Sequence, residues 1–496
     1  MLHQGHPMRP SRRALLQGAG ALLGTVPLRA AAADATARGA VGGTVSPVMA
    51  RLSAYMGEAR DRALPDGIVE KAKHHILDTF AAMVSGSGLP PARAAYSFAT
   101  SYGGSGEATL VASRGTADPL VAALVNGMLA HSDETDDSNE FSQSHPGAPI
   151  VPAALAAAET FGIDGTRFLR AVTLGYDVGP RVTLSFDAIP FRNTSHKSTH
   201  AIAGAFGAAA AAACAAGLDA QQMRWVLDYA AQQSSGIGAW TRDTQHIEKS
   251  FVFAGMPARS GLTAALMVKA GCTGIDDIFS GADNYFLAYA PDARLDELTA
   301  GLGTRYEIAR TNIKKWTVGS PIQAPLDALS NILQRHRIEP EAVTSVTVRV
   351  AHTEARIVDN RDMPDICLQH MVAIMLLDGT ASFQAAHDSD RMADPTVLRL
   401  RAKVRLIPSD ELERLEPARA AIVDIALNDG TVLSDKVLAV RGTADNPMPR
   451  AEVVTKCRDL MAPILGADRT SRLIDAVLAI ETVGTMRDVA GLLRLG

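Results

Sequence analysis

Histidine, lysine and carboxylate side chains gather at four places in this sequence, and each place lies shortly before a predicted helix. The four places are His131–His145, Ser195–His200, Lys249 and Lys314–Lys315. Helix amino termini carry partial positive charge and free N–H groups, so together with these side chains they would bind carboxylates. Any one place alone is more typical of a solvated helix cap. The four places together would form a site for proton transfer beside a carboxylate only if they converge in space.

Metal and cofactor chemistry find less support. Metal-ligand side chains occur in His131–His145, but their spacing matches no standard metal loop, and the sequence has no helical Glu-His pair. The four cysteines form no C-x-x-C pair, which indicates small buried side chains rather than a zinc or iron–sulfur site. There is also no G-x-S-x-G nucleophile elbow and no convincing dinucleotide-binding glycine pattern. We therefore expect neither a metal nor a cofactor.

Three segments resemble the MmgE/PrpD family. His131–Ala157 resembles its signature, in which an acidic residue and an Asp-Asp pair lead to His-Pro and a Pro-Ala-Ala-Leu helix. Ala72–Gly86 matches its Leu-Asp-Thr helix, and Gly204–Gln222 matches its Ala-rich helix. The resemblance covers nearly all of the chain beyond residue 45. It implies a helical domain with an α/β lid, a homodimer without cofactor and a small carboxylate substrate, as in 2-methylcitrate dehydratase and cis-aconitate decarboxylase.

The resemblance assigns catalytic roles to individual residues. The family's acidic residue falls on Glu134, its hydroxyl residue on Ser138, and the histidine of His-Pro on His145, after one extra loop residue. One family lysine falls near Lys249 with an offset of one residue. A second falls on Lys314, matched by its distance to a following aspartate.

Other positions depart from the family pattern. The family's next histidine aligns on Ser198, so His196 or His200 must replace it, and His200 is favoured. The family's active-site tyrosine falls on His370, which we expect to transfer protons instead. Arg259, shortly after the start of a predicted helix, joins His196 and Ser198 as an expected substrate-binding residue.

The resemblance and these residues together predict a lyase, either a hydro-lyase or a decarboxylase of a small di- or tricarboxylate. Lysines would stabilise negative charge that develops on carbon beside a carboxylate, and histidines would move the proton. Asp136 and Asp137 would bind substrate or orient a histidine or lysine. An epimerase or isomerase using the same proton abstraction is one alternative. A carboxylate-binding protein without turnover is another.

The predicted elements that position these residues fall into two kinds. Residues 46–302 are dominated by helical patterns, which begin with Ser46 as a cap and Pro47 at the first helical position. The predicted helices are Ser46–Arg60, Pro65–Val84, Ala117–His131, Pro152–Phe161, Gly165–Val182 and Ala201–Gly217. The last of these is nearly all Ala and Gly, so we expect it to pack closely on other helices.

The pattern changes at residue 303, where alternating apolar and polar residues predict strands. The predicted strands are Tyr306–Ala309, Val343–Val350, Ile422–Leu427 and Val432–Val440, and Asn428-Asp429-Gly430 predicts a hairpin turn between the last two. Pro321–His336 and Leu368–Leu377 are predicted helices among them. We therefore predict a mostly α protein, with an α/β lid domain at 303–445 and carboxyl-terminal helices at 446–496 that return to the helical domain.

The amino terminus predicts export. Arg12-Arg13 precedes a weakly apolar stretch and then Ala30–Ala33, which is the order of a twin-arginine signal. We assign residues 1–33 to this signal and 34–45 to a linker, and expect a periplasmic protein. We expect no later segment to span a membrane, because none has about 18 uninterrupted apolar residues without charge. The net charge of −5 with scattered basic residues argues against nucleic-acid binding.

Overall fold

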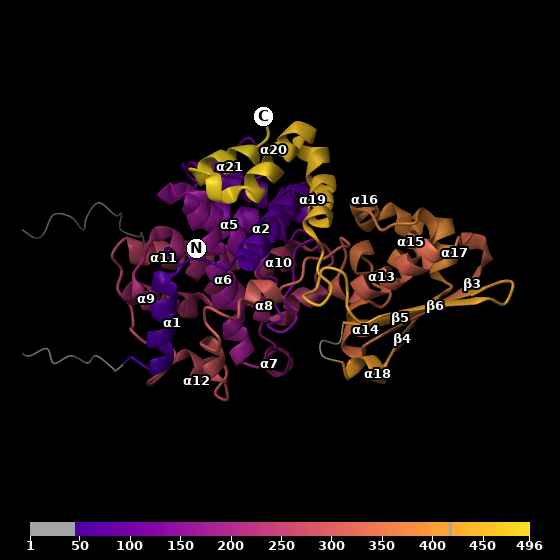
Figure 1. Cartoon of the computed structure of the whole chain (residues 1–496), viewed down its shortest axis with the longest axis horizontal. Coiled ribbons are helices and arrows are strands. Elements are labelled where there is room, and N and C mark those ends of the chain that lie inside the picture. Colours follow the sequence, from indigo (N-terminus) through magenta and orange to yellow (C-terminus); the bar gives the residue numbers. More distant parts are fainter. Residues whose placement is uncertain (1–44, 416–418) are drawn as a thin grey trace, which may run out of the picture. The chain divides into compact units, whose positions relative to one another are not determined.

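The computed structural model describes residues 45–415 and 419–496. The predicted signal and almost all of the predicted linker lie outside the described residues. Most of the described chain is helical, and strands form only two small sheets (Figure 1). The predicted fold class, mostly α with a smaller α/β part, is confirmed.

The larger hydrophobic core is built by helices from both ends of the described chain. Ser46 caps the first helix as predicted, and its Oγ accepts a hydrogen bond from the Met49 N–H at 3.2 Å. The amino-terminal helices are α1 (Pro47–Glu58), α2 (Asp66–Gly86), α3 (Pro90–Tyr102), α4 (Pro119–Ala130), α5 (Gly147–Phe161), α6 (Gly165–Ser185), α7 (Ala188–Ser195), α8 (Thr199–Ala216), α9 (Ala220–Gln233), α10 (Ile247–Ser250), α11 (Met256–Lys269) and α12 (Tyr285–Tyr289). A short pair of strands, β1 (Ala108–Thr109) and β2 (Thr116–Ala117), lies before α4.

The Ala-rich helix α8 lies at the centre of this core and is wholly buried. It packs against α5, α6 and α11. A Cβ atom at Gly207 would lie 2.7 Å from a side-chain atom of Ile150 and 2.9 Å from the Gly175 carbonyl oxygen, so these helices approach too closely for larger residues. The predicted close packing of this helix is confirmed.

Two helical stretches are long and apolar enough to cross a membrane by length and composition, contrary to the expectation from the sequence. They are Thr199–Ala216 and Ile247–Lys269. The first is fully buried and the second is two-thirds buried inside the protein, as is usual for core helices of this composition.

Helix α5 begins earlier than predicted, at Gly147 rather than at Pro152. The side chain of Asp137 explains the early start, because its Oδ1 accepts a hydrogen bond from the Gly147 N–H at 2.9 Å. Pro149 lies in the first turn, where its missing N–H costs nothing. His145 is therefore only two residues from a helix amino terminus.

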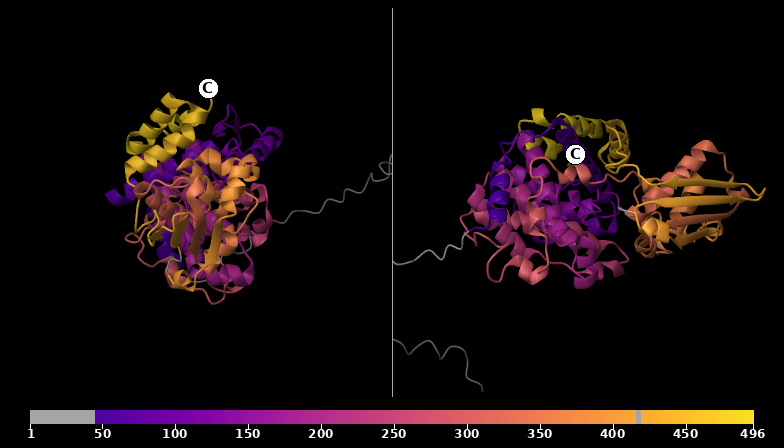
Figure 2. Two further views of the ribbon diagram at one scale, coloured as in Figure 1. Left: turned by 90° about the vertical axis from the view of Figure 1, so that its right-hand side faces the viewer. Right: turned by 60° about the horizontal axis from the view of Figure 1, so that its bottom comes forward.

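The α/β part has a separate core, which runs from Val318 to Val440. Its sheet has the strand order β4-β3-β5-β6, with β3 and β4 parallel and the other pairs antiparallel. Helices α13 and α15 cover one face of this sheet (Figures 1 and 2). The elements are α13 (Ser320–Arg335), β3 (Val343–Val350), α14 (His352–Val358), α15 (Leu368–Asp378), α16 (Phe383–His387), α17 (Pro395–Arg401), β4 (Val404–Pro408), α18 (Asp410–Glu413), β5 (Ala421–Leu427) and β6 (Val432–Val437).

The strand predicted at Tyr306–Ala309 is wrong, because Glu307–Arg310 forms a 3-10 turn. The Glu307 N–H donates to Asp177 Oδ1 at 2.8 Å, and the buried Glu307 carboxylate pairs with Arg305 and Arg310. This segment therefore belongs to the larger core, which includes Ile308 and Ile313. The predicted strand Val343–Val350 and the hairpin are confirmed, with Gly430 in the left-handed region at φ 87°.

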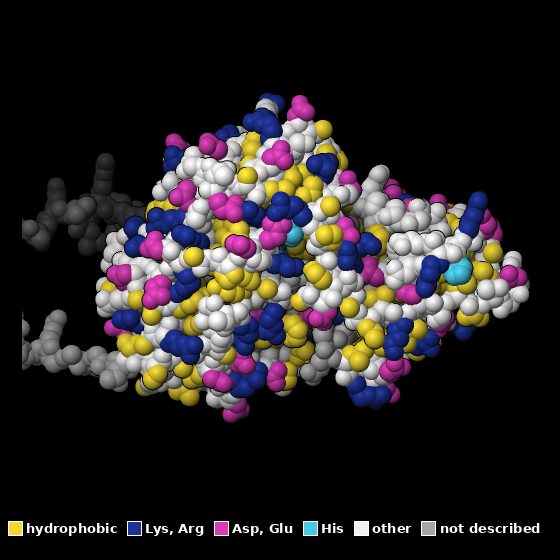
Figure 3. Space-filling view, in the orientation of Figure 1, with side chains coloured by type: hydrophobic (Ala, Val, Ile, Leu, Met, Phe, Trp, Pro, Cys, Tyr) yellow, Lys and Arg dark blue, Asp and Glu magenta, His cyan; other side chains and the backbone are white. Residues whose placement is uncertain are grey.

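The carboxyl-terminal helices pack on the larger core. They are α19 (Arg450–Leu465), α20 (Ala467–Leu478) and α21 (Met486–Leu492). Helices α19 and α20 contact α2, and α21 contacts α5. On the face of the molecule shown in Figure 3, basic and acidic side chains are interspersed, in line with the scattered charge of the sequence.

Candidate active site

The loop between α4 and α5 carries five buried carboxylates, and three of them are predicted site residues. They are Glu134, Asp136 and Asp137, with 4%, 0% and 0% of their surface exposed. Buried carboxylates require charged or hydrogen-bonding partners. The partners of these three define the candidate site and the structure that holds it in place.

Glu134 contacts two lysines from different parts of the chain. The ammonium group of Lys249 is in direct contact with Oε1. Lys314 Nζ lies 3.3 Å from Oε2 and donates to the Glu134 carbonyl oxygen at 2.9 Å. Burial alone would raise the pKa of Glu134, but Lys249 and Lys314 hold it well below its usual range. The group is an anion with a cation on each oxygen.

Asp136 lies between two histidines. Its Oδ2 is 2.9 Å from His131 Nδ1 and 3.1 Å from His145 Nδ1, and its Oδ1 is 3.5 Å from Lys314 Nζ. Burial would raise the pKa of Asp136, but these neighbours hold it well below its usual range. Burial lowers the pKa of His145 despite the nearby carboxylate. His145 is thus a neutral imidazole whose orientation is fixed by an aspartate, as a proton-transfer group requires.

Asp137 faces away from the lysines and holds the loop to the helical core. Its Oδ2 accepts a hydrogen bond from the Tyr176 hydroxyl at 2.5 Å and lies 2.8 Å from His75 Nδ1. Lys456 of α19 fixes the same loop, because it donates to Asp78 Oδ1 at 2.6 Å and to the Thr135 carbonyl oxygen at 3.1 Å. Asp137 is therefore in place to support the site rather than to bind substrate.

Lys249 lies on α10, which continues through a π-helical turn, Phe251–Gly255, into α11. A π-helical turn accommodates one extra residue in an otherwise regular helix. The sequence suggested that Lys249 precedes a helix, but in the structure it lies on the helix itself.

Aromatic rings form a wall beside Lys249, whose Nζ lies 5.5 Å from the Trp240 ring and 5.3 Å from the Phe253 ring. Phe253 lies between two histidines, with ring centroids 4.6 Å from His131 and 3.9 Å from His200, and both pairs are stacked. Trp240 packs edge-on against Phe253 at 4.7 Å. Burial lowers the pKa of His200 well below its usual range. The predicted His200 therefore adjoins the site as a neutral ring, 5.3 Å from the ring of His145.

Four other predicted site residues make no side-chain hydrogen bond or ion pair with this cluster among the described residues. His196 and Arg259 are exposed, and the Ser198 side chain caps α8 by accepting from the Ala201 N–H. Ser138 is paired through its backbone with Asn312, and its Oγ is 3.4 Å from Ser320 Oγ.

His370 lies inside the α/β core on α15. Burial lowers its pKa to about 4, and the charged groups that affect it are Arg401, Arg391 and Asp388. Among the described residues, neither ring nitrogen of His370 has a hydrogen-bond partner, so His370 does not contact Glu134 or Asp136 through a hydrogen bond or ion pair.

Two residues of the α/β part that the sequence analysis did not identify, His387 and Asp365, lie closer to the α4–α5 loop than His370 does. His387 Nε2 forms an ion pair with Asp133 Oδ2 at 2.9 Å. Burial alone would lower the pKa of His387, but Asp133 raises it to about 9. Asp365 is also buried nearby, and burial raises its pKa to about 7. Neither residue belongs to a motif in the sequence, so there was no reason to select them from the sequence.

The described residues include two groups with metal-ligand side chains at close range. They are His131, Asp136 and His145, and His131, Glu134 and His246. In each group a lysine ammonium already contacts the carboxylate, Lys314 in the first and Lys249 in the second. A divalent cation would be repelled by that fixed charge. The arrangement fits anion binding better than metal binding.

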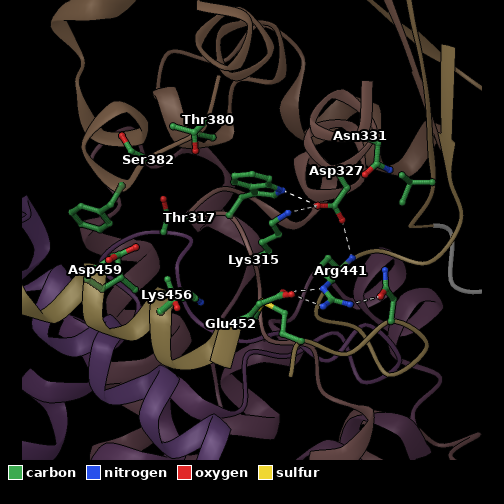
Figure 4. A pocket seen from close by; sticks show the side chains of 18 of the residues that line it. Lys315, Thr317, Asp327, Asn331, Thr380, Ser382, Arg441, Glu452, Lys456 and Asp459 are labelled. Carbon is green, nitrogen blue, oxygen red and sulfur yellow. Dashed lines mark hydrogen bonds and ion pairs between the residues drawn. The ribbon is translucent and has the colours of Figure 1, made fainter. Parts of the chain in front are cut away.

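A separate cavity of about 1270 Å³ lies between α13, β6 and α19. Figure 4 shows that Arg441 in this cavity pairs with Glu452, at 2.6 Å, and Lys456 of the same cavity pairs with Asp78. Lys315 similarly lies 3.9 Å from Asp327. Because these cations are already paired, the buried cluster around Glu134 remains the better candidate for chemistry.

Two family models and several known proteins match most of this chain. Residues 50–298 match the MmgE/PrpD N-terminal domain, and residues 316–482 match the MmgE/PrpD C-terminal domain. A cis-aconitate decarboxylase-like protein of Aspergillus oryzae is 24% identical over 90% of this chain and 97% of its own length. Cis-aconitate decarboxylase of Aspergillus terreus is 24% identical over 87% of this chain and 92% of its own. The Mus musculus cis-aconitate decarboxylase is 25% identical over 84% of this chain and 87% of its own.

Proposed function

The chain belongs to the MmgE/PrpD family, and on that premise we propose that it is a cofactor-independent lyase of a small di- or tricarboxylate. The reaction would be a decarboxylation, as the names of its relatives suggest, or a dehydration. One observation carries the proposal. Two lysines from separate segments meet on the buried Glu134, beside an aspartate that orients His145.

Both reactions place negative charge on a carbon next to a carboxylate. Decarboxylation breaks the bond to the departing CO₂ and leaves its electron pair on carbon, which then takes up a proton. Dehydration removes a proton from that carbon, and the hydroxyl group leaves the neighbouring carbon as water. In either case a fixed cation beside the substrate carboxylate lowers the cost of the charge.

The residues of the site supply these needs in different ways. Lys249 is the more exposed of the two lysines, with 14% of its side chain accessible against 2% for Lys314, so it is the better placed to meet an incoming carboxylate. Lys314 is held by Glu134 and Asp136 and provides a permanent charge. The neutral His145 is able to take up or return the proton.

The test is turnover by the purified protein, in buffer with EDTA, of cis-aconitate and of hydroxylated di- and tricarboxylates. Released CO₂ identifies a decarboxylase, and a new double bond identifies a hydro-lyase. Exchange of substrate hydrogen for deuterium in D₂O without either product would identify the epimerase or isomerase instead. Binding without any of these changes would contradict the lyase proposal, and so would turnover that EDTA abolishes and an added divalent metal restores.

A variant pair connects turnover to the site. Lys249→Met should lower kcat/KM by roughly 10²–10³-fold, by analogy with the loss of a single charge-stabilising donor. Lys269→Met is the matched control, because Lys269 lies on the same continuous helix but contacts the Ala216 carbonyl oxygen at 3.0 Å and the Phe161 ring at 5.9 Å. Equal activity of both variants would remove Lys249 from the site.

A further inference from the structure

His246 is a buried histidine beside Glu134 that the resemblance to the family does not mark. It precedes α10, and its backbone is in the left-handed region at φ 63° and ψ 6°. Only 5% of its surface is exposed. Its Nε2 lies 3.9 Å from Glu134 Oε1, the same oxygen that contacts Lys249, and its ring centroid is 5.2 Å from that of His131.

Packing alone does not explain this arrangement. A left-handed backbone is strained for a residue other than glycine. Asp243 holds the segment in this conformation, because its carboxylate accepts from the N–H groups of Gln245 and Lys249, both at 2.9 Å. Nε2 is buried without a hydrogen-bond partner among the described residues, which is uncommon for a histidine that only stabilises a fold. The segment thus presents His246 and Lys249 together to one oxygen.

Glu134 poses a difficulty for the proposed reaction. If Lys249 moves to a substrate carboxylate, Oε1 loses its cation inside a buried site. An uncompensated buried charge is costly, and that cost would hold Lys249 back from the substrate. Lys314 does not relieve it, because Lys314 is on the other oxygen, Oε2.

We propose that His246 is a positioning residue that takes over Glu134 Oε1 when Lys249 turns to the substrate. A side-chain rotation that shortens the 3.9 Å separation by about 1 Å brings Nε2–H within hydrogen-bonding distance of that oxygen. His246 therefore acts through Glu134 and Lys249 rather than on the substrate. The inference rests on the proposed function, since it requires a carboxylate ligand.

The charge state of His246 suits this role. Burial lowers its pKa well below the usual range, and Lys249 and His131 lower it further, against the opposing effect of Glu134 and Asp136. The ring is neutral near pH 7 and carries a single N–H. It is able to replace an ammonium as a donor without adding a second cation to the site.

Three variants separate this role from a structural one. His246→Phe keeps an aromatic ring but has no donor, and His246→Asn keeps a donor on a residue that tolerates the left-handed backbone. His246→Gly has neither donor nor strain and serves if the Phe variant fails to fold. Binding of succinate and of cis-aconitate is measured by calorimetry, with kcat, KM and the pH–rate profile on the same samples and a thermal melt as the folding control.

We expect His246→Phe and His246→Gly to weaken acid binding and raise KM by roughly 10- to 100-fold, the value of one hydrogen bond to a charged group. The acid limb of the kcat profile, which reports the enzyme–substrate complex, should move to higher pH, because Glu134 loses its donor in that complex. His246→Asn should stay within about 3-fold of the wild type, a difference below 1 kcal/mol.

Two results would overturn the inference alone. The first is wild-type binding and pH profile in both donor-free variants. The second is an Asn variant as impaired as the Phe variant at equal melting temperature, since the ring itself would then be required. A wild-type protein that neither binds nor converts the acids would overturn the proposed function, and this inference with it.

Discussion

Lys314→Met is the substitution that tests most directly whether the buried cluster exists as described. Lys314 has 3% of its surface exposed and contacts the carboxylates of both Glu134 and Asp136. Burial would lower its pKa, but the two carboxylates raise it, so the side chain is a cation throughout the neutral range. Methionine fills similar space without the charge.

The expected loss of unfolding free energy is about 3–5 kcal/mol, because removal of one partner leaves a buried charge without compensation. The sequence alone suggests a much smaller loss, about 0–1 kcal/mol, for a lysine placed before a helix. Lys315→Met is the matched control. Lys315 is the next residue, is about one-third exposed and lies 3.9 Å from Asp327, so the smaller loss should apply there.

The stability difference between wild type and Lys314→Met should also depend on pH in a defined direction. Lys249 and Lys314 hold the pKa of Glu134 below its usual 4.5, so this group stabilises the fold above that pH. The contribution is lost as the pH falls through the lower, folded-state pKa. Without Lys314 the contribution shrinks. The difference between wild type and Lys314→Met should therefore be largest near pH 7 and decrease below about pH 4.5.

Denaturant unfolding near pH 7 and below about pH 4.5, with turnover measured on the same samples, tests this prediction. Turnover should fall by roughly 10²–10³-fold in Lys314→Met and hardly at all in Lys315→Met. A Lys314→Met protein within 1 kcal/mol of the wild type at pH 7 would refute the geometry. So would an equal loss of stability in the two variants.

Three further predictions concern other parts of the chain. Asp133 raises the pKa of His387 from 6.5 to about 9, so His387 should stabilise the fold fully below pH 6.5. This contribution, about 3 kcal/mol at most, should be lost as the pH rises through 9. The unfolding free energy of His387→Asn should not show this decrease with pH. His370→Leu should stabilise the protein by about 1–3 kcal/mol, and more at pH 5 than at pH 7, because a buried histidine with a pKa of about 4 resists the proton that the unfolded chain binds below 6.5. Loss of a limb of its pH–rate profile would return His370 to a proton-transfer role. Replacement of Arg12 and Arg13 by lysine should retain the precursor in the cytoplasm, and unchanged periplasmic levels would exclude a twin-arginine signal.

The elements that local sequence determines were predictable. Caps, helical periodicity and the Asn-Asp-Gly turn mark α1, β3 and the hairpin β5–β6 within a few residues. Elements that depend on distant partners were not. Helix α5 begins at Gly147 because Asp137 accepts its N–H, and the turn at Glu307 follows from its bond to Asp177. Neither partner is adjacent in sequence.

The site shows the same division. Glu134, His145, Lys249 and Lys314 were predictable because a motif places each of them, and the structure brings these four together. The sequence did not distinguish Asp136, which faces the histidines, from Asp137, which faces the core. Adjacent loop residues point in opposite directions for reasons that lie in α2 and α6, where His75 and Tyr176 bind Asp137.

The π-helical turn after Lys249 connects sequence, fold and chemistry. An extra residue in a regular helix would rotate everything before it by about 100° relative to the residues after it. Such a rotation would turn Lys249 away from Glu134, or turn α11 away from α8. The π-helical turn at Phe251–Gly255 absorbs the residue locally, so α11 keeps its packing on α8 while Lys249 still contacts Glu134. It also places Phe253 between His131 and His200, where the aromatic wall of the site forms. The π-helical turn therefore sets both the position of the cation and the aromatic surface beside it, and we expect the choice of substrate to depend on that surface.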